Sequence, residues 1–295
     1  MRLLSFKAVI LAIIVAIVFI LFQYIPKGNE PISTPQNVTL HFGQQGIEDF
    51  NTYTGGNVDV QPAGMSFFDL FWTPPALGSV NIAHENHALR IDNAFSVLGN
   101  SKNNNVSKGI IGISIDSSLN KAEFVEPQEA YLAYKELLTQ INQQGWQQYY
   151  APYASRISKQ DNLRSIKQSN EVTDPRYILS YEEWSDLFNS NPDQRLDYNL
   201  YLDGIIMNIT LKKTKANEFG QEQYLLRYSF NTAGYTGVNL VENGSKLEGA
   251  ALRKAYEDYT KLSFNDRSKQ ELELQEQGYT IDESYETPDF WEYIQ

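Results

Sequence analysis

The longest apolar run of the chain lies at its amino end. Every residue of Ala8–Phe22 is apolar, and the stretch continues through Gln23 and Tyr24 to Ile25 before Pro26 and Lys27 end it. At about 1.5 Å of rise per residue, a helix over Leu3–Ile25 can cross a hydrocarbon core about 30 Å thick. The pattern therefore predicts a membrane-spanning helix within residues 1–26, because a buried core helix is rarely apolar on every side.

The residues around this run favour a retained anchor over a cleaved signal peptide. The stretch Gln23–Asn29 offers no pair of small residues at the spacing that signal peptidase needs. Arg2 and Lys7 flank the apolar stretch on its N-terminal side, and the positive-inside rule keeps that end in the cytoplasm. We therefore expect a short cytoplasmic start, a tether over residues 27–37, and a single domain over residues 38–295 on the far side of the membrane.

Periodic apolar positions beyond the tether predict three helices. Pro127 opens the clearest one, in which apolar residues recur at steps of three and four, and Gly145 stands at its exit. Ser180 and Glu183 have the spacing of a capping box and predict a second helix. The third is expected over 250–262.

Runs of β-branched and aromatic residues predict strands. Gly109–Ile115 has the composition of a buried strand that Asp116–Ser118 closes. Tyr198–Leu202 and Ile205–Leu211 flank Asp203-Gly204, a dipeptide that favours a type I′ hairpin turn, and 224–230 is a third strand beside them. Residues 38–95 are short and irregular in pattern, and the Asn-rich residues 100–108 indicate a surface loop. The fold class is α+β, with an antiparallel sheet and helices packed mainly on one face.

Charge and composition exclude several classes of protein. Residues after Lys27 contain 21 basic against 36 acidic residues, a net charge of −15, and such a domain repels nucleic acid. The chain has no Cys, which excludes disulfides, thiolate nucleophiles and thiolate metal sites. We expect no cofactor.

Two histidines stand close together in His84-Glu85-Asn86-His87. Zinc peptidases place two histidines four residues apart on a helix, whereas the step here is three and the flanking residues are typical of strands that meet at a turn. An exposed turn is therefore favoured over a metal site at His84 and His87.

The C-terminal stretch combines acids and aromatics in an unusual way, since no Lys or Arg follows Glu271. One interpretation is an arm whose aromatics pack onto the domain while its acids face water. The other is a docking surface, in which aromatic anchors bury area and the negative field selects a basic partner. The residues predicted to bind this partner are Asp282, Glu283, Tyr285, Glu286, Asp289, Phe290 and Trp291.

Two other functions stay open. One is an envelope hydrolase that uses carboxylates or a metal at His84 and His87; paired acids such as Glu182 with Glu183 are frequent, but spacing alone does not define a cleft. The other is an accessory subunit of a membrane complex, bound through the anchor and the aromatic residues of 67–72.

In its overall plan, an anchor followed by an acidic exported module, the chain resembles the membrane-anchored periplasmic immunity proteins of type VI secretion effectors. The resemblance covers the anchor and the architecture. It implies a single-pass protein of the bacterial inner membrane, with a periplasmic domain that lacks catalytic residues and neutralises a toxin by protein binding.

Overall fold

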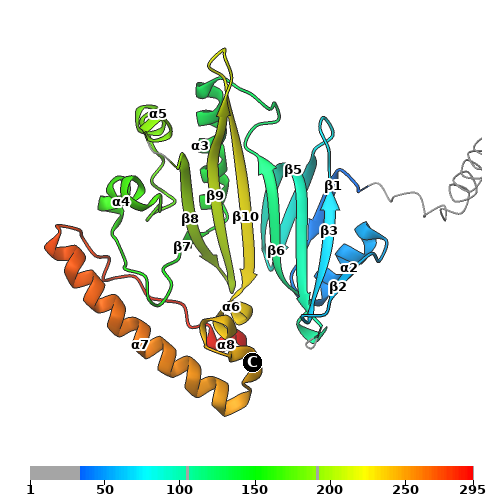
Figure 1. Cartoon of the computed structure of the whole chain (residues 1–295), viewed down its shortest axis with the longest axis vertical. Helices are drawn as coiled ribbons and strands as arrows, with labels where there is room; N and C mark the ends of the chain where they lie inside the picture. Colours follow the sequence, from blue (N-terminus) through cyan, green and yellow to red (C-terminus); the bar gives the residue numbers. More distant parts are fainter. Residues whose placement is uncertain (1–33, 104–105, 191–192, 295) are drawn as a thin grey trace, which may run out of the picture. The chain divides into compact units, whose positions relative to one another are not determined.

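The structure is a computed structural model and describes residues 34–294 except 104–105 and 191–192 (Figure 1). It has the α+β class expected from the sequence. The strands are β1 (Asn37–Leu40), β2 (Asp59–Gln61), β3 (Met65–Phe71), β4 (Gly78–His84), β5 (His87–Lys102), β6 (Ile110–Ser118), β7 (Gln147–Gln148), β8 (Arg195–Leu202), β9 (Ile205–Ala216) and β10 (Glu222–Thr232). The helices are α2 (Gly43–Thr54), α3 (Pro127–Gln143), α4 (Asn162–Ser169), α5 (Tyr181–Ser190), α6 (Ala233–Leu240), α7 (Gly249–Glu276) and α8 (Trp291–Ile294).

The strands form one ten-stranded sheet in the order β1-β4-β5-β6-β10-β9-β8-β7. The long strand β5 pairs with β4 along its first half and with β3 along its second half, and β2 lies beyond β3. The sheet is mixed, because β1 pairs with β4 in parallel. The expectation of a purely antiparallel sheet was wrong here: α2, β2 and β3 lie between β1 and β4 in the chain and provide the crossover that a parallel pair requires.

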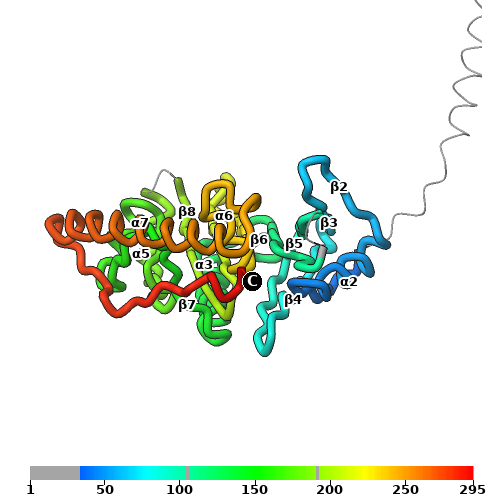
Figure 2. The backbone as a smooth tube through the Cα atoms, turned by 90° about the horizontal axis from the view of Figure 1, so that it is seen from below, coloured from blue at the N-terminus to red at the C-terminus, as the bar shows by residue number. Residues whose placement is uncertain are grey.

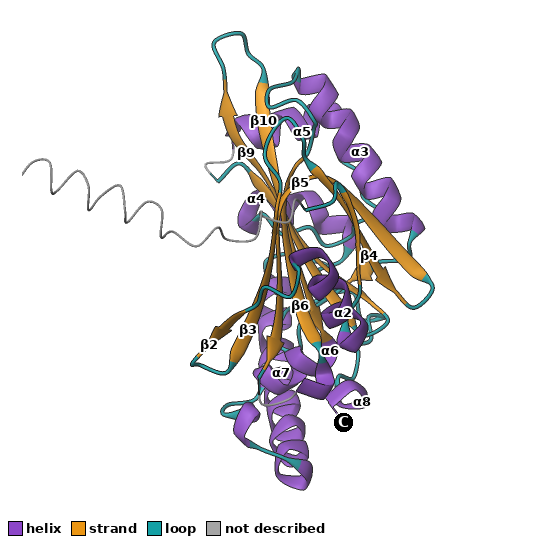
Figure 3. Cartoon of the chain, turned by 90° about the vertical axis from the view of Figure 1, so that its right-hand side faces the viewer, coloured by secondary structure: helices purple, strands orange, loops and turns teal. Residues whose placement is uncertain are grey.

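One face of the sheet carries the main core. The strands contribute side chains to it at alternate positions, as in the burial pattern of β8, and α2, α3, α4 and α5 cover them. Figure 3 shows α2 and α3 on the same side of the sheet. The packing is close where Phe50 of α2 lies against Gly99 of β5; a Cβ at Gly99 would come within 2.4 Å of the Phe50 ring. A larger residue at position 99 would therefore displace α2.

The helices predicted at Pro127 and Ser180 are confirmed as α3 and α5. Ala130, Tyr134, Leu138 and Ile141 are the buried positions of α3, as the spacing indicated. The capping box also forms: the Glu183 amide donates to Ser180 Oγ at 3.2 Å, and the Ser180 amide donates to the Glu183 carboxylate at 2.8 Å. These two bonds fix the start of α5.

A second, smaller cluster lies on the opposite face of β8 and β9. Ile206 and Tyr201 alternate with core residues along their strands and pack with α6, α7 and α8. Helices therefore cover both faces, and the expectation that they pack mainly on one face was wrong, because the outward positions near this hairpin are also apolar. The residues after α7 (277–294, the C-terminal arm) run back along that helix (Figures 1 and 2).

The predicted hairpin is confirmed. Tyr198 faces Ile209 and Leu202 faces Ile205, and the turn residues Asp203 and Gly204 have φ angles of 42° and 83°. Both angles are positive, as a type I′ turn requires.

Four expectations for other segments need correction. Residues 38–95 form regular strands and the helix α2. Strand β5 runs to Lys102, into the expected loop, and β6 continues through Ser118. Helix α7 extends to Glu276, well beyond the predicted end at 262.

The predicted anchor over residues 1–26 and most of the tether over 27–37 lie outside the described residues. Among the helices in the described part of the chain, none has the length and apolar character that a bilayer crossing requires.

Candidate functional site

The C-terminal arm is held against the loop that follows β7. After the turn at Gly278, the amide of Ser158 donates to the carbonyl of Thr280 at 2.8 Å, and the amide of Asp282 donates to the carbonyl of Arg156 at 2.7 Å. Ile281 and Ile157 form an antiparallel bridge between these two bonds. The arm thus adds a short extended segment to the edge of the loop.

The three aromatic residues predicted as partner anchors contact the domain itself. Phe290 is fully buried, with its ring 5.6 Å from that of Tyr149. Tyr285 lies edge-on to Tyr150 at 5.0 Å, and its hydroxyl accepts a hydrogen bond from the Tyr150 amide at 2.9 Å. Trp291 is half-buried, with its ring 5.9 Å from that of Tyr256. These rings hold the arm in place.

The four predicted acids stay at the surface to different degrees. Glu283, Glu286 and Asp289 are exposed and Asp282 is half-buried. Asp289 accepts from the Trp291 amide at 2.9 Å, so it caps the start of α8. Asp282 accepts from the amide and hydroxyl of Ser284 at 3.1 and 2.5 Å.

Part of the predicted site lines an open groove of about 770 Å³, which we call the arm groove. The arm supplies Asp282, Tyr285 and Glu286 to one wall, and Asp174 and Arg176 line it from the segment after α4. Glu283, Asp289, Phe290 and Trp291 do not line the groove. The remaining lining residues are Asn142, Gly145, Trp146, Gln147, Gln148, Tyr150, Ile157, Ser158, Lys159, Thr173, Pro175 and Ser284.

The carboxylates of the arm groove differ in how they are compensated. Asp174 is buried and is bound by Arg176 through two bonds, Nε to Oδ1 at 2.9 Å and Nη2 to Oδ2 at 3.2 Å. These hydrogen bonds and the charge of Asp174 raise the pKa of Arg176. Asp282 acts at longer range. Burial is the main cause that raises the pKa of the Tyr150 phenol, and the negative charge of Asp282 raises it further, so Tyr150 stays neutral. Asp174 is thus satisfied internally, whereas Asp282 and Glu286 present negative charge to the groove.

Two arginines connect the loop after β7 and the C-terminal arm to helix α7. Arg156 binds Glu271 of α7 through Nε to Oε1 at 2.9 Å and Nη2 to Oε2 at 2.8 Å. Arg267, also in α7, is buried and donates to the carbonyl of Ala151 at 2.6 Å and to the hydroxyl of Thr287 at 3.0 Å. The loop, the helix and the arm therefore form one preassembled unit.

The sequence reasoning missed Asp174, Tyr150 and these arginine contacts. The contacts of α7 left one trace in the sequence, which is the spacing of its inward-facing residues. The buried positions of α7 fall at steps of four and seven along the helix. The stripe begins as apolar and continues as polar, which apolar periodicity does not detect; its members are Leu252, Tyr256, Ser263, Arg267 and Glu271.

His84 and His87 lie at the β4–β5 turn, as expected. Both contact the turn of the neighbouring hairpin: His84 Nε2 donates to the carbonyl of Asp203 at 2.7 Å, and His87 Nε2 lies 3.1 Å from the Asp203 carboxylate. Among the described residues, no group of three or more His, Asp or Glu side chains is arranged to hold a metal ion. The two histidines thus join two hairpin turns.

The aromatic residues of 67–72 belong largely to β3. Phe68 and Trp72 are buried in the main core, while Phe71 is exposed on the other face. Only part of this cluster is therefore available as the surface of an accessory subunit.

Comparisons with protein-family models, with curated proteins and with solved structures found no match for this chain.

Proposed function

We propose that this chain is a binding protein that recognises a basic segment of a protein partner in the arm groove. In this proposal residues 3–25 hold it in the bacterial inner membrane and the domain lies in the periplasm. The most fitting role is that of an immunity protein against a secreted antibacterial toxin. The observation that carries the proposal is the placement of Asp282 and Glu286, which line an open groove and, among the described residues, form no ion pair within 4 Å like that of Asp174 with Arg176.

The chemistry of the arm groove suits a lysine- or arginine-rich segment. Long cationic side chains can lay their apolar stems on aromatic and aliphatic groups while their charged ends reach carboxylates. Trp146, Tyr285 and Ile157 supply such groups, and Asp282 and Glu286 supply the carboxylates. The exposed Glu283 adds negative charge on the arm between them.

The arm groove also needs little rearrangement before binding. Its walls are fixed by the Arg156–Glu271 pair and by the contacts of Arg267 with the loop and the arm. A preorganised site loses less conformational entropy when it binds, so more of the contact energy appears as affinity. The negative field of the domain should in addition speed the encounter with a cationic partner.

Charge reversal on the arm tests the proposal. The full-length chain with Asp282→Lys, Glu283→Lys and Glu286→Lys should bind octalysine about tenfold or more weakly than wild type in calorimetry. Exposed charge pairs are worth up to about 1 kcal/mol each, and repulsion adds to their loss. The matched control is Glu129→Lys, Glu136→Lys and Glu182→Lys on α3 and α5, which changes net charge equally at exposed positions.

The control triple should stay within about twofold of wild type at physiological ionic strength, where the Debye length is about 8 Å. If both triples weaken binding equally, octalysine senses only net charge and the arm groove is not the site. The wild-type association rate should also fall between about 0.01 M and 0.15 M salt, and a constant rate would count against steering.

A further inference from the structure

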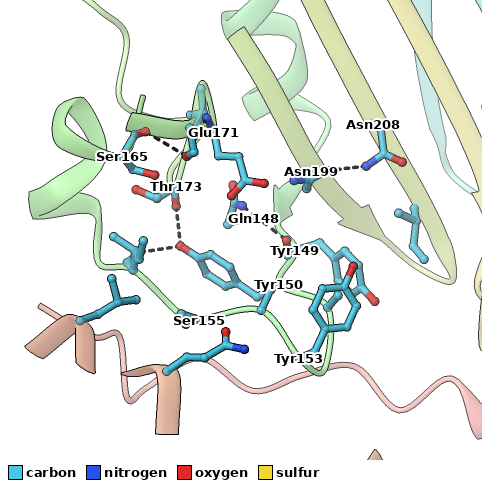
Figure 4. Close-up of a pocket in the computed structure, with 18 of the residues that line it drawn as sticks. Gln148, Tyr149, Tyr150, Tyr153, Ser155, Ser165, Glu171, Thr173, Asn199 and Asn208 are labelled. Atoms are coloured by element: carbon cyan, nitrogen blue, oxygen red, sulfur yellow. Dashed lines mark hydrogen bonds between the residues drawn. The ribbon is translucent and has the colours of Figure 1, made fainter. Parts of the chain in front are cut away.

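A second cavity, of about 560 Å³, is drawn in Figure 4 and shares Gln148, Tyr150, Ile157 and Thr173 with the arm groove. Asn199 of β8 and Asn208 of β9 form its sheet wall, and α4 contributes Ser165 and Gln168. The loop after β7 brings Tyr149 and Tyr153, and α7 contributes Gln270 and Leu274. We call it the tyrosine cavity. Its volume falls within the range of about 300–1,000 Å³ that small-molecule sites occupy.

The tyrosine cavity is polar but almost uncharged. None of the described residues that line it is Lys, Arg or His, and Glu171 is its single carboxyl group. Burial, and then the charge of Asp197, raise the pKa of Glu171. Burial likewise raises the pKa of the Tyr149 phenol. Phosphates and other anions would find no cation here to bind them.

Hydrogen-bonding groups are left without partners in this cavity. Gln148 Oε1 and Ser165 Oγ are buried and, within the described part of the chain, make no hydrogen bond. Asn208 Nδ2 donates to Asn199 Oδ1 at 2.5 Å, so neither the amide N–H groups of Asn199 nor the side-chain carbonyl of Asn208 takes part in that bond. Buried polar groups are normally satisfied, and unpaired ones indicate that water or a ligand supplies the missing bonds.

We propose that the tyrosine cavity binds a short neutral oligosaccharide. Each sugar hydroxyl both donates and accepts, and planar amides such as those of Asn199 and Asn208 carry donors and an acceptor on one plane. Tyrosine rings give an apolar face for the C–H groups of a sugar ring together with a polar hydroxyl. Tyr153, which is 54% exposed, lines the cavity.

Calorimetry on the full-length chain, in a detergent without a sugar headgroup, tests this proposal. The probes are maltotriose, cellotriose and tri-N-acetylchitotriose, with trigalacturonate as an anionic match in size. At least one neutral probe should bind, and trigalacturonate should bind at least about tenfold more weakly. Failure of all three neutral probes, or tighter binding of trigalacturonate, would overturn the proposal and leave a cavity that holds only water.

Two variants locate the binding. Asn199→Leu with Asn208→Leu replaces both members of a hydrogen-bonded pair by groups of similar size, so the fold should survive while sugar binding falls about tenfold or more. Tyr153→Ala should weaken binding as well, whereas Tyr181→Ala, on α5 outside the cavity, should not. Equal binding by wild type and the double variant would contradict the assignment. None of these variants alters a residue of the arm triple, so octalysine binding should persist and the two proposals can fail separately.

Discussion

Replacing Glu271 by Ala should lower the free energy of unfolding by roughly 3–5 kcal/mol, because it leaves two arginines without their shared carboxylate. Glu271 is buried and accepts three hydrogen bonds from Arg156, one from its amide and two from its guanidinium. The buried Arg267 also loses a nearby opposite charge. Urea unfolding of the full-length chain, followed by circular dichroism, measures the loss.

The exposed Glu273, two residues along α7, provides the matched control. Glu273→Ala removes the same carboxylate from the same helix and should change stability by less than about 0.5 kcal/mol. If Glu271→Ala is equally mild, the Arg156 contact does not hold the arm groove together.

The contribution of Glu271 should also depend on pH. Burial alone would raise its pKa, but the hydrogen bonds from Arg156 and the charges of Arg156 and Arg267 lower the pKa below the ordinary value of 4.5. A lowered folded-state pKa means that the stabilisation is fully present above pH 4.5 and is lost as pH falls through the folded-state value. The difference in stability between wild type and Glu271→Gln should therefore shrink below about pH 4.5, and a constant difference would contradict the assignment.

A second large effect is expected at the buried pair of Lys213 and Glu222, which joins β9 to β10. Lys213 Nζ lies 2.5 Å from the Glu222 carboxylate, which also accepts a hydrogen bond from the Tyr224 hydroxyl at 2.7 Å. Glu222→Ala should cost roughly 3–5 kcal/mol, because it leaves a buried ammonium group without its counter-ion. Chemical unfolding measures this cost.

The double variant Lys213→Met with Glu222→Leu should recover most of that loss, since apolar side chains of similar volume can replace a buried ion pair. Lys215→Met, at an exposed position of the same strand, is the control and should be close to neutral. A double variant as unstable as Glu222→Ala would show that the strand pairing needs the charges themselves.

Local sequence signals predicted the elements that depend on neighbours in the chain. Ser180 and Glu183 lie three residues apart, and Asp203-Gly204 forms its turn from two residues, so both features could be identified from the sequence. Helix α2 was missed, because Phe50 and Gly46 are its only buried residues and two glycines lower its helix propensity.

The candidate site was harder to predict, since it depends on contacts between distant segments. Arg156 and Glu271 are 115 residues apart, and Tyr150 and Tyr285 are 135 apart. The acids and aromatics of the arm could be selected by composition. Which of them would line a groove could not, because the aromatics Tyr285 and Phe290 fold against Tyr150 and Tyr149.

The most direct test of the account uses the absence of Cys from the sequence. A single Cys can replace the exposed Ser284 of the arm groove, or Thr52 of α2 as a control. Spheroplasts that produce the full-length variants are treated with a membrane-impermeant maleimide, with or without octalysine, and the rate of labelling is measured. The account predicts labelling at both positions before lysis and protection by octalysine at position 284 alone. Labelling only after lysis would contradict the account. So would a rate of labelling at position 284 that octalysine does not lower.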